Sequence, residues 1–425
     1  MKALEAPKKS PEIARGYHKR ESKVATKTRQ PVIPITEIEH AAFCKTEDAL
    51  PAKSLAEEKA VNVRWQNIPG EYLHCTVEEL DERIHYAKRT LGKSVTILGH
   101  HYQREEVIKY ADFQGDSFLL SQEAASRSEA SYIVFCGVHF MAETACILCA
   151  PNQKVILPNI TAGCSMADMA PMDDVEDAWQ DLDEVLAGHG GITPITYMNS
   201  IAGIKALCGR NGGAVCTSSN AAAVMEFGFQ QAGRILFLPD QHLGRNTGLK
   251  LGIPLDQMVV WDPFKRMGGN TPEQLRSAKL VLWKGHCSVH TRFTVGQVQA
   301  ARKRYPDVTV IAHPECIMET VSAADMVGST EFIRNAINNA PPGSKWAVGT
   351  EISLVNRLAL QNPDKVVFCL DPVTCPCSTM YRIHPAYLLW VLEGLVEGKV
   401  VNQITVPADI KRDAQVALDR MLALR

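Results

Sequence analysis

The chain lacks several features that would assign it to a special class of protein. No run of about 18 consecutive apolar residues occurs among its 425 positions, so no membrane-spanning helix is expected. The formal net charge of −2 argues against a general affinity for nucleic acid or acidic membranes. The N-terminus has no apolar core of the kind that secretory signals contain. These absences indicate an ordinary soluble globular protein that is cytoplasmic.

Cysteine, in contrast, is plentiful, with 13 residues. The odd count and irregular spacing argue against a disulfide framework, and we expect reduced thiols. Five cysteines in apolar stretches are interpreted as small buried hydrophobic residues: Cys136, Cys146, Cys149, Cys208 and Cys369. Cys146 and Cys149 have a spacing that could suit a metal, but they fall in an apolar helical run, which favours burial.

The chain is long enough for two or three domains of about 100 to 150 residues each. Residues 1–70 are interpreted as a flexible N-terminal extension, because the first thirty contain nine Lys or Arg with little apolar periodicity. From about residue 75, short β-branched runs alternate with helical segments. This alternation predicts an α/β fold with parallel sheets covered by helices on both faces.

Three related stretches follow one another along the chain, and each begins with an apolar run that ends in a polar pair. The pairs are His100 and Tyr102, Tyr197 and Asn199, and His313 and Glu315. A hydroxyl residue follows each pair at a similar interval, at Ser117, Ser218 and Thr330. Polar residues at strand ends predict a site, because sites in parallel sheets lie beyond the carboxyl ends of the strands.

A cysteine completes each stretch. The interval is 64 positions from His100 to Cys164 and again from His313 to Cys377, whereas 90 positions separate Tyr197 from Cys287. The middle stretch therefore carries an insertion, which we place near residues 244–271. Cys375 lies two positions before Cys377, but the interval of 64 selects Cys377. The spacing predicts a three-part enzyme with one iron-sulfur cluster.

The residue types suggest the chemistry of the site. The hydroxyl residues precede apolar helical runs, so each is interpreted as an N-cap, and three helix starts together would favour a multiply anionic ligand. A single serine before a helix is usually only a cap. Thiolates suit iron-sulfur clusters or zinc, and three of them leave one metal position open for Lewis-acid catalysis.

The chain resembles the quinolinate synthase family in an ordered series of motifs between about residues 90 and 385. The motifs are GHHYQ at 99–103, GDS at 115–117, FMAETA at 140–145, YMNS at 197–200, CTS at 216–218, PDQHLG at 239–244, GHCSVH at 285–290, HPE at 313–315, VGST at 327–330 and GTE at 349–351. The resemblance implies three similar parallel-sheet αβα domains around a pseudo-threefold axis, with the active site at the centre. It also implies condensation of iminoaspartate with dihydroxyacetone phosphate to quinolinate, with release of phosphate and water, in de novo NAD biosynthesis.

Together with the repeat, the resemblance predicts a first domain of residues 75–163 plus 378–425. The second domain is expected at 165–286 and the third at 288–376. L-Aspartate oxidase is the expected supplier of iminoaspartate, and no nucleic-acid or membrane partner is expected.

The resemblance also implies roles for individual residues. A 4Fe-4S cluster would be held by Cys164, Cys287 and Cys377. Tyr102 and Glu315 would be the acid-base residues, with His100 and His313 also counted as catalytic. The residues expected to contact substrate are His100, Ser117, Tyr197, Asn199, Ser218, His290, His313, Glu315, Ser329 and Thr330.

Other functions are compatible with parts of this pattern. The three cysteines alone would permit a hydro-lyase with an open cluster that acts on a hydroxy acid. A redox or iron sensor is a further class, although a sensor needs no pocket for anions. Zinc in place of iron would give a zinc enzyme. Cys375 could compete with Cys377 as a ligand or form a redox pair with it.

Overall fold

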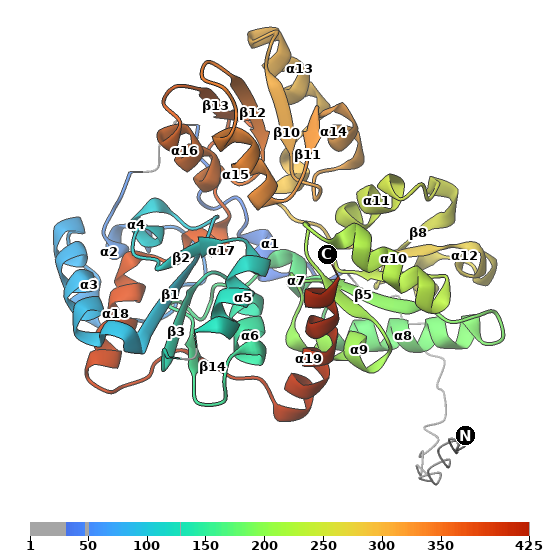
Figure 1. The fold of residues 1–425 in the computed structure, drawn as a ribbon, viewed down its shortest axis with the longest axis horizontal. Helices are drawn as coiled ribbons and strands as arrows, with labels where there is room; N and C mark the ends of the chain where they lie inside the picture. The colour runs from blue at the N-terminus through green and yellow to red at the C-terminus, as the bar shows by residue number, and fades with distance from the viewer. Residues whose placement is uncertain (1–30, 47–50, 128, 425) are drawn as a thin grey trace, which may run out of the picture.

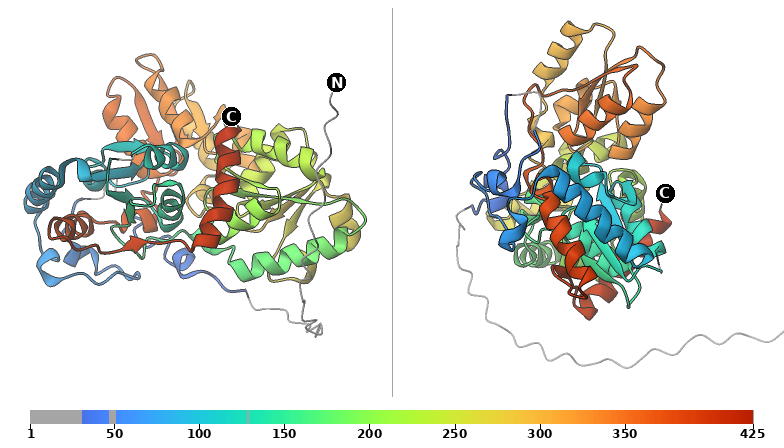
Figure 2. Two further views of the ribbon diagram at one scale, coloured as in Figure 1. Left: turned by 60° about the horizontal axis from the view of Figure 1, so that its bottom comes forward. Right: turned by 90° about the vertical axis from the view of Figure 1, so that its left-hand side faces the viewer.

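The computed structural model describes residues 31–46, 51–127 and 129–424. Three α/β units surround a common centre, each with its own mainly parallel sheet (Figure 1). The two further views in Figure 2 show the same lobes, with the third unit (orange) above the first (cyan). Among the described residues, no helix is both long and apolar enough to cross a membrane. The predicted fold class is confirmed.

The first unit is a five-stranded sheet in the order β14-β4-β3-β1-β2, in which only β14 is antiparallel to its neighbour. Its strands are β1 (Val95–His100), β2 (Phe113–Gly115), β3 (Tyr132–Cys136), β4 (Lys154–Ile156) and β14 (Gln403–Ile404). Its helices are α3 (Val77–Leu91), α4 (Glu105–Ile108), α5 (Ser117–Ser126), α6 (His139–Leu148) and α18 (Pro385–Val396). All six residues of β1 are buried, as expected for a strand covered on both faces.

The second unit has the strand order β6-β5-β7-β9-β8, all parallel. Its strands are β5 (Thr193–Tyr197), β6 (Ala214–Cys216), β7 (Ile235–Leu238), β8 (Met258–Trp261) and β9 (Leu280–Trp283). Its helices are α7 (Ser165–Asp168), α8 (Met172–Leu186), α9 (Ala202–Arg210), α10 (Ala221–Ala232), α11 (Gln241–Lys250) and α12 (Pro272–Ser277). The expected insertion contains β8, which extends the sheet beyond β9.

The third unit has the order β11-β10-β12-β13, again all parallel. Its strands are β10 (Thr309–Ala312), β11 (Met326–Val327), β12 (Lys345–Gly349) and β13 (Val366–Cys369). Its helices are α13 (Val295–Arg304), α14 (Met318–Ala323), α15 (Thr330–Asn338) and α16 (Ile352–Gln361). Without the inserted β8, four strands in each unit share one arrangement, in which the fourth, third, first and second strands lie side by side. Each polar pair lies at the carboxyl end of a first strand, and each of the three cysteines follows a fourth strand.

Each of the three sheets falls within one of the predicted domain ranges, but the C-terminal helix differs from the prediction. Strand β14 joins the sheet of the first unit, and helix α18 packs against its helix α3. Helix α19 (Ala408–Ala423) instead packs mainly against α9 and β6 of the second unit (Figure 1). A close approach makes this contact possible, because the side-chain-free Gly209 on α9 lies against the backbone of Asp413.

The prediction of a flexible extension over residues 1–70 is wrong for the part that the structure describes. Helices α1 (Ile35–Ile38) and α2 (Leu55–Glu58) form there, and Leu55 is fully buried. Glu58 pairs with the buried Arg104 at 2.7 Å, and Glu39 pairs with the buried Arg382 at 2.6 Å. These acidic residues pack onto the body of the protein because they neutralise arginines that burial would otherwise leave unpaired. Residues 1–30 and 47–50 lie outside the described residues.

Candidate active site

A central cavity lies where the three units meet, at the carboxyl ends of the parallel strands. It encloses about 660 Å³ not filled by protein atoms, part of which is open to solvent. Thirteen of the predicted site residues line it: His100, Tyr102, Ser117, Cys164, Tyr197, Asn199, Ser218, Cys287, His290, His313, Glu315, Thr330 and Cys377. The shared topology explains this convergence, since equivalent strands deliver equivalent residues to one edge of each sheet.

Ser329 is the predicted site residue that the structure places elsewhere. Its hydroxyl accepts a hydrogen bond from the Phe332 backbone N–H and caps helix α15. The side chain lines a neighbouring cleft between α10, α11 and α15 that also contains Ser218. Ser329 therefore fixes the start of the helix whose first residue, Thr330, reaches the central cavity.

The three hydroxyl residues Ser117, Ser218 and Thr330 were expected to be N-caps, and this is wrong for each of them, since Ser329 rather than Thr330 caps helix α15. Helix α5 is capped by Asp116, whose carboxylate accepts from Phe118 N and Leu119 N, so Ser117 is the first helical residue. Helix α10 begins after Asn220, two positions beyond Ser218. The Asn220 side chain accepts a hydrogen bond from Thr217 N instead, at 2.8 Å. Asp and Asn compete strongly with Ser at helix starts, and both were present in the sequence.

A hydrogen-bonded network of residues from all three units occupies one wall of the cavity. Tyr197 Oη donates to Glu315 Oε1 at 2.6 Å, and His290 Nδ1 lies 3.0 Å from Glu315 Oε2. The His290 and His313 rings stack with centroids 4.4 Å apart. Tyr102 Oη lies 3.4 Å from His290 Nε2. The residues following the first strands of all three units are thereby linked into one connected set.

Burial sets the protonation of this network. Burial, and then the charge of Glu315, raises the pKa of both Tyr102 and Tyr197 well above the ordinary value. Burial also lowers the pKa of His313 to about 3 and the pKa of His100 well below its usual range. Burial opposes the charge on Glu315, but the neighbouring histidines and the Tyr197 hydroxyl outweigh it and lower the pKa of Glu315. Near neutral pH this network therefore holds the ionised Glu315 carboxylate beside two protonated phenols.

Thr350 and Glu351 were not predicted as site residues. The sequence motif at 349–351 that contains them was recognised, but no role was assigned to it. Thr350 Oγ1 lies 2.8 Å from Tyr102 Oη and 3.2 Å from His290 Nε2, so it orients both. Glu351 is fully buried, and its carboxylate accepts hydrogen bonds from Ser353 N and Cys377 N. Both residues directly follow the apolar strand β12, which is the signal that could have found them.

The donor set of the cavity suits an iron-sulfur cluster, because it includes three cysteines, one from each unit. Cys164, Cys287 and Cys377 line the same cavity, and burial raises the pKa of each thiol. The structure thus holds three soft ligands that need an added positive charge to become thiolates. Cys287 also lies with His290 and Glu315 in a group whose ligand atoms are within 4.8 Å of one another, which would suit a single metal ion.

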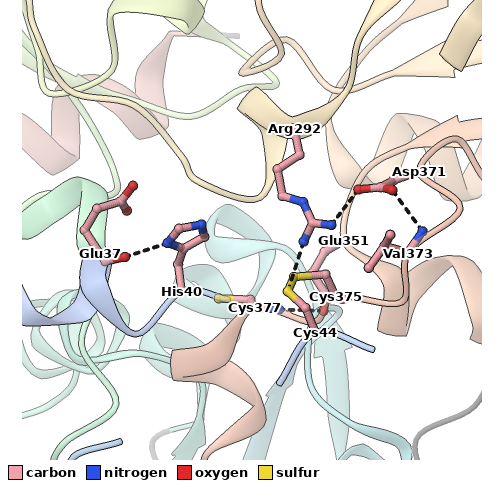
Figure 3. The surroundings of a disulfide bond; sticks show 9 residues. All are labelled: Glu37, His40, Cys44, Arg292, Glu351, Asp371, Val373, Cys375 and Cys377. Atoms are coloured by element: carbon pink, nitrogen blue, oxygen red, sulfur yellow. Dashed lines mark hydrogen bonds and ion pairs between the residues drawn. A yellow bond between two sulfur atoms is a disulfide. The ribbon is translucent and has the colours of Figure 1, made fainter. Parts of the chain in front are cut away.

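Cys375 neither lines the central cavity nor pairs with Cys377 (Figure 3). It forms a disulfide with Cys44, 331 positions away in the sequence. The expectation of thiols without disulfides is therefore wrong for this pair. The other eleven cysteines, all in the described part of the chain, are free.

Comparison with known proteins gives consistent matches over most of the chain. A family model described as quinolinate synthetase A protein matches residues 82–423. The quinolinate synthase of Corynebacterium glutamicum is 58% identical over 361 residues, which cover 85% of this chain and 91% of that protein. The quinolinate synthase of Herpetosiphon aurantiacus is 55% identical over 356 residues, covering 83% and 95%. That of Anoxybacillus flavithermus is 54% identical over 359 residues, covering 84% and 96%.

Proposed function

The chain belongs to the quinolinate synthetase A protein family, and on this basis we propose that it forms quinolinate from iminoaspartate and dihydroxyacetone phosphate. Phosphate and water are released, and the product enters the biosynthesis of NAD. The observation that carries the proposal is the meeting of three cysteines, one from each unit, with the Tyr197–Glu315–His290 network in a single central cavity.

Cys164, Cys287 and Cys377 would hold a 4Fe-4S cluster. When bound, the cluster would supply a Lewis acid through its iron without a protein ligand, which helps a hydroxyl group to leave. The contribution of the chain is to hold the thiolates. The buried Glu351 supports this by accepting a hydrogen bond from the Cys377 backbone N–H at 3.1 Å, which fixes the loop of the third ligand.

The substrates carry carboxylate and phosphate groups, and the cavity offers neutral donors for them. His100, Ser117 and Ser218 would bind one carboxylate, while His313 and Thr330 would bind the other carboxylate or the phosphate. Ser329 acts through its neighbour, because it caps the helix that begins at Thr330. Among the residues that the structure describes, none makes a hydrogen bond to the buried Asn199 side-chain oxygen, and Asn199 lines the cavity, so this oxygen can accept a hydrogen bond from a substrate N–H or O–H.

Proton transfer is assigned to Tyr102 and Glu315. Tyr102 keeps its proton near neutral pH and lies beside Thr330 and Thr350, at 3.2 Å and 2.8 Å, so its hydroxyl is held as a donor. Glu315 is ionised and can accept a proton when substrate displaces Tyr197 or His290 from its oxygens. A neutral donor and an ionised acceptor side by side suit enolisation followed by dehydration.

The proposed setting follows from the substrates. Iminoaspartate must be supplied by oxidation of aspartate, so L-aspartate oxidase is the expected source, and the cytoplasm is the proposed location.

The proposal is tested by purifying the protein without air, measuring its iron, sulfide and zinc, and assaying quinolinate. We expect about four iron and four sulfide per chain. Quinolinate should form only when iminoaspartate and dihydroxyacetone phosphate are both present. Dehydration of a simple hydroxy acid without quinolinate would favour a hydro-lyase. Zinc in place of iron, held by Cys287, His290 and Glu315, would contradict the cluster.

A further inference from the structure

A segment that precedes the residues matched by the family model crosses all three cysteine loops. This segment, residues 34–46, is called the N-terminal strap. It begins with helix α1 and ends at a backbone hydrogen bond from Lys45 N to Thr374 O of 2.8 Å. The residues matched by the family model begin only at position 82. The strap therefore lies outside the part of the chain that the family model matches.

The strap contacts the loops of the first two cysteines through polar side chains. Thr36 Oγ1 donates to Asp168 Oδ2 at 2.7 Å, and Asp168 ends the short helix α7 that Cys164 precedes. Glu37 Oε1 lies 3.3 Å from the Nε2 atom of His286, the residue before Cys287. Each contact reaches a residue within four positions of a proposed cluster ligand.

The third loop is tied covalently. Cys44 is bonded to Cys375, two positions before Cys377, and Arg292 Nη1 donates to Cys44 Sγ at 3.3 Å (Figure 3). Arg292 is itself held by Asp371 at 2.6 Å. The strap thus has one anchor beside each of the three cysteines that line the cavity.

The strap is also packed into the body between these anchors. Phe43 is buried, with its ring 5.0 Å from that of Tyr381 and 6.0 Å from that of Trp65. Glu39 forms the buried ion pair with Arg382 at 2.6 Å. The buried ring and the buried ion pair hold the strap in one position on the body.

Thr36 and His40 of the strap line a second, smaller cavity, and the three cysteines Cys164, Cys287 and Cys377 line it too. The same three residues line the central cavity. The thiols therefore lie between two spaces, one that would receive substrates and one that the strap bounds.

We propose that the N-terminal strap is a fourth wall of the cysteine site, fastened by the Cys44–Cys375 bond, which shields a bound cluster from water and dioxygen. This inference rests on the proposed function, since it requires a cluster at the three cysteines. The bond would form by exchange with a small-molecule disulfide. Each of the two thiols gives up one proton and one electron, and the disulfide leaves as two thiols.

The test follows the cluster rather than catalysis. Anaerobically purified wild-type, Cys44→Ser and Cys146→Ser proteins are exposed to air while visible absorption and released iron are recorded. All three should begin with equal iron and sulfide. Cys44→Ser should then lose its cluster on the order of fivefold faster, because the strap opens locally once its fastener is gone. Cys146→Ser removes a free cysteine outside the strap and should match the wild type.

A second pair of measurements separates the strap from a general loss of folding. Thr36→Val with Glu37→Ala keeps the disulfide and removes the other two anchors, and it should also hasten cluster loss. Dithiothreitol should accelerate the loss in the wild type to the rate of Cys44→Ser and leave Cys44→Ser unchanged. Equal rates in wild type and Cys44→Ser would overturn the proposal while the proposed function stands. Absence of iron and sulfide from every anaerobic preparation would overturn both.

Discussion

The first and third units share a contact between the first strand and an aspartate that follows it. In the first unit Asp112 accepts a hydrogen bond from the Ile97 backbone N–H at 2.8 Å and pairs with Lys88. In the third unit Asp325 accepts from Val310 N–H at 2.7 Å and pairs with Arg302. Each aspartate lies fifteen positions after the residue whose N–H it accepts. This contact between an aspartate and a strand N–H, which we call the shared frame, thus appears in both units, although the basic partner of the aspartate differs.

The two units differ at the residues placed on that frame. His100 is followed two positions later by Tyr102, and His313 by Glu315, so one unit presents a phenol and the other a carboxylate at equivalent points. Each histidine accepts a hydrogen bond from the later residue's N–H, at 3.1 Å and 3.4 Å. A repeated backbone can therefore supply both members of the proposed acid-base pair, because only the side chain changes.

We expect the largest effect from removing a cysteine of the proposed cluster, and comparing two such variants tests whether the first and third units contribute equally. Cys164→Ala and Cys377→Ala, at equivalent positions, should each lose most of the iron and the visible sulfur-to-iron absorption. Cys149→Ala, which removes a buried cysteine outside the cavity, should keep both. Iron analysis and absorption spectra of anaerobic preparations measure this. Full absorption in either cavity variant would remove that cysteine from the ligand set.

Substitution of the proposed acid-base residues should have the next largest effect, on turnover. Tyr102→Phe and Glu315→Gln should each lower kcat by about 10²- to 10⁴-fold while the cluster spectrum remains, because each removes a proton-transfer group. Steady-state kinetics beside the absorption spectrum measure both properties. Tyr102→Phe with wild-type turnover would exclude the phenol from the mechanism.

A buried ion pair distinguishes the first unit from the third. Arg104 lies four positions after His100 and is buried against Glu58, whereas the equivalent position in the third unit is Ile317. Glu58→Ala should lower the free energy of unfolding by about 3–5 kcal/mol, because it leaves the arginine short of its main partner. The double change Glu58→Leu with Arg104→Met should cost much less. Urea unfolding measures both, and an equal loss in the two variants would contradict the account.

The shared frame gives the smallest effects. Asp112→Ala and Asp325→Ala should each lower the free energy of unfolding by about 1–3 kcal/mol, because a strand N–H loses its acceptor. Asp112→Asn and Asp325→Asn keep an acceptor oxygen and should cost less. Thermal or urea unfolding gives the values. A large loss for one aspartate and none for the other would show that the two frames are not equivalent.

Much of the site could be predicted because a repeat carries information that one motif lacks. The interval of 64 residues identified Cys164 and Cys377, and the apolar runs identified the strand ends at His100 and His313. The disulfide of Cys44 could not be found in this way, since 331 residues separate it from Cys375 and no periodicity links them. The packing of α19 on the second unit could not be found either, because α19 is far in sequence from the helix α9 and strand β6 that it contacts.

The capping residues were misread for a local reason. Asp116 and Ser117 are adjacent, and both residue types can cap a helix, so the sequence left two positions open. The structure resolves the choice through the two backbone N–H groups that the Asp116 carboxylate accepts. Thr350 was recognisable as part of a motif, but its role depends on Tyr102, which lies in another unit.

We propose that each unit donates one thiolate to a single cluster. A crystal structure of the anaerobically purified protein, with anomalous data collected at the iron edge, tests it most directly. The account predicts one compact iron signal in contact with the sulfur atoms of Cys164, Cys287 and Cys377. A lone metal ion bound by Cys287, His290 and Glu315, with the other two sulfur atoms free, would contradict it.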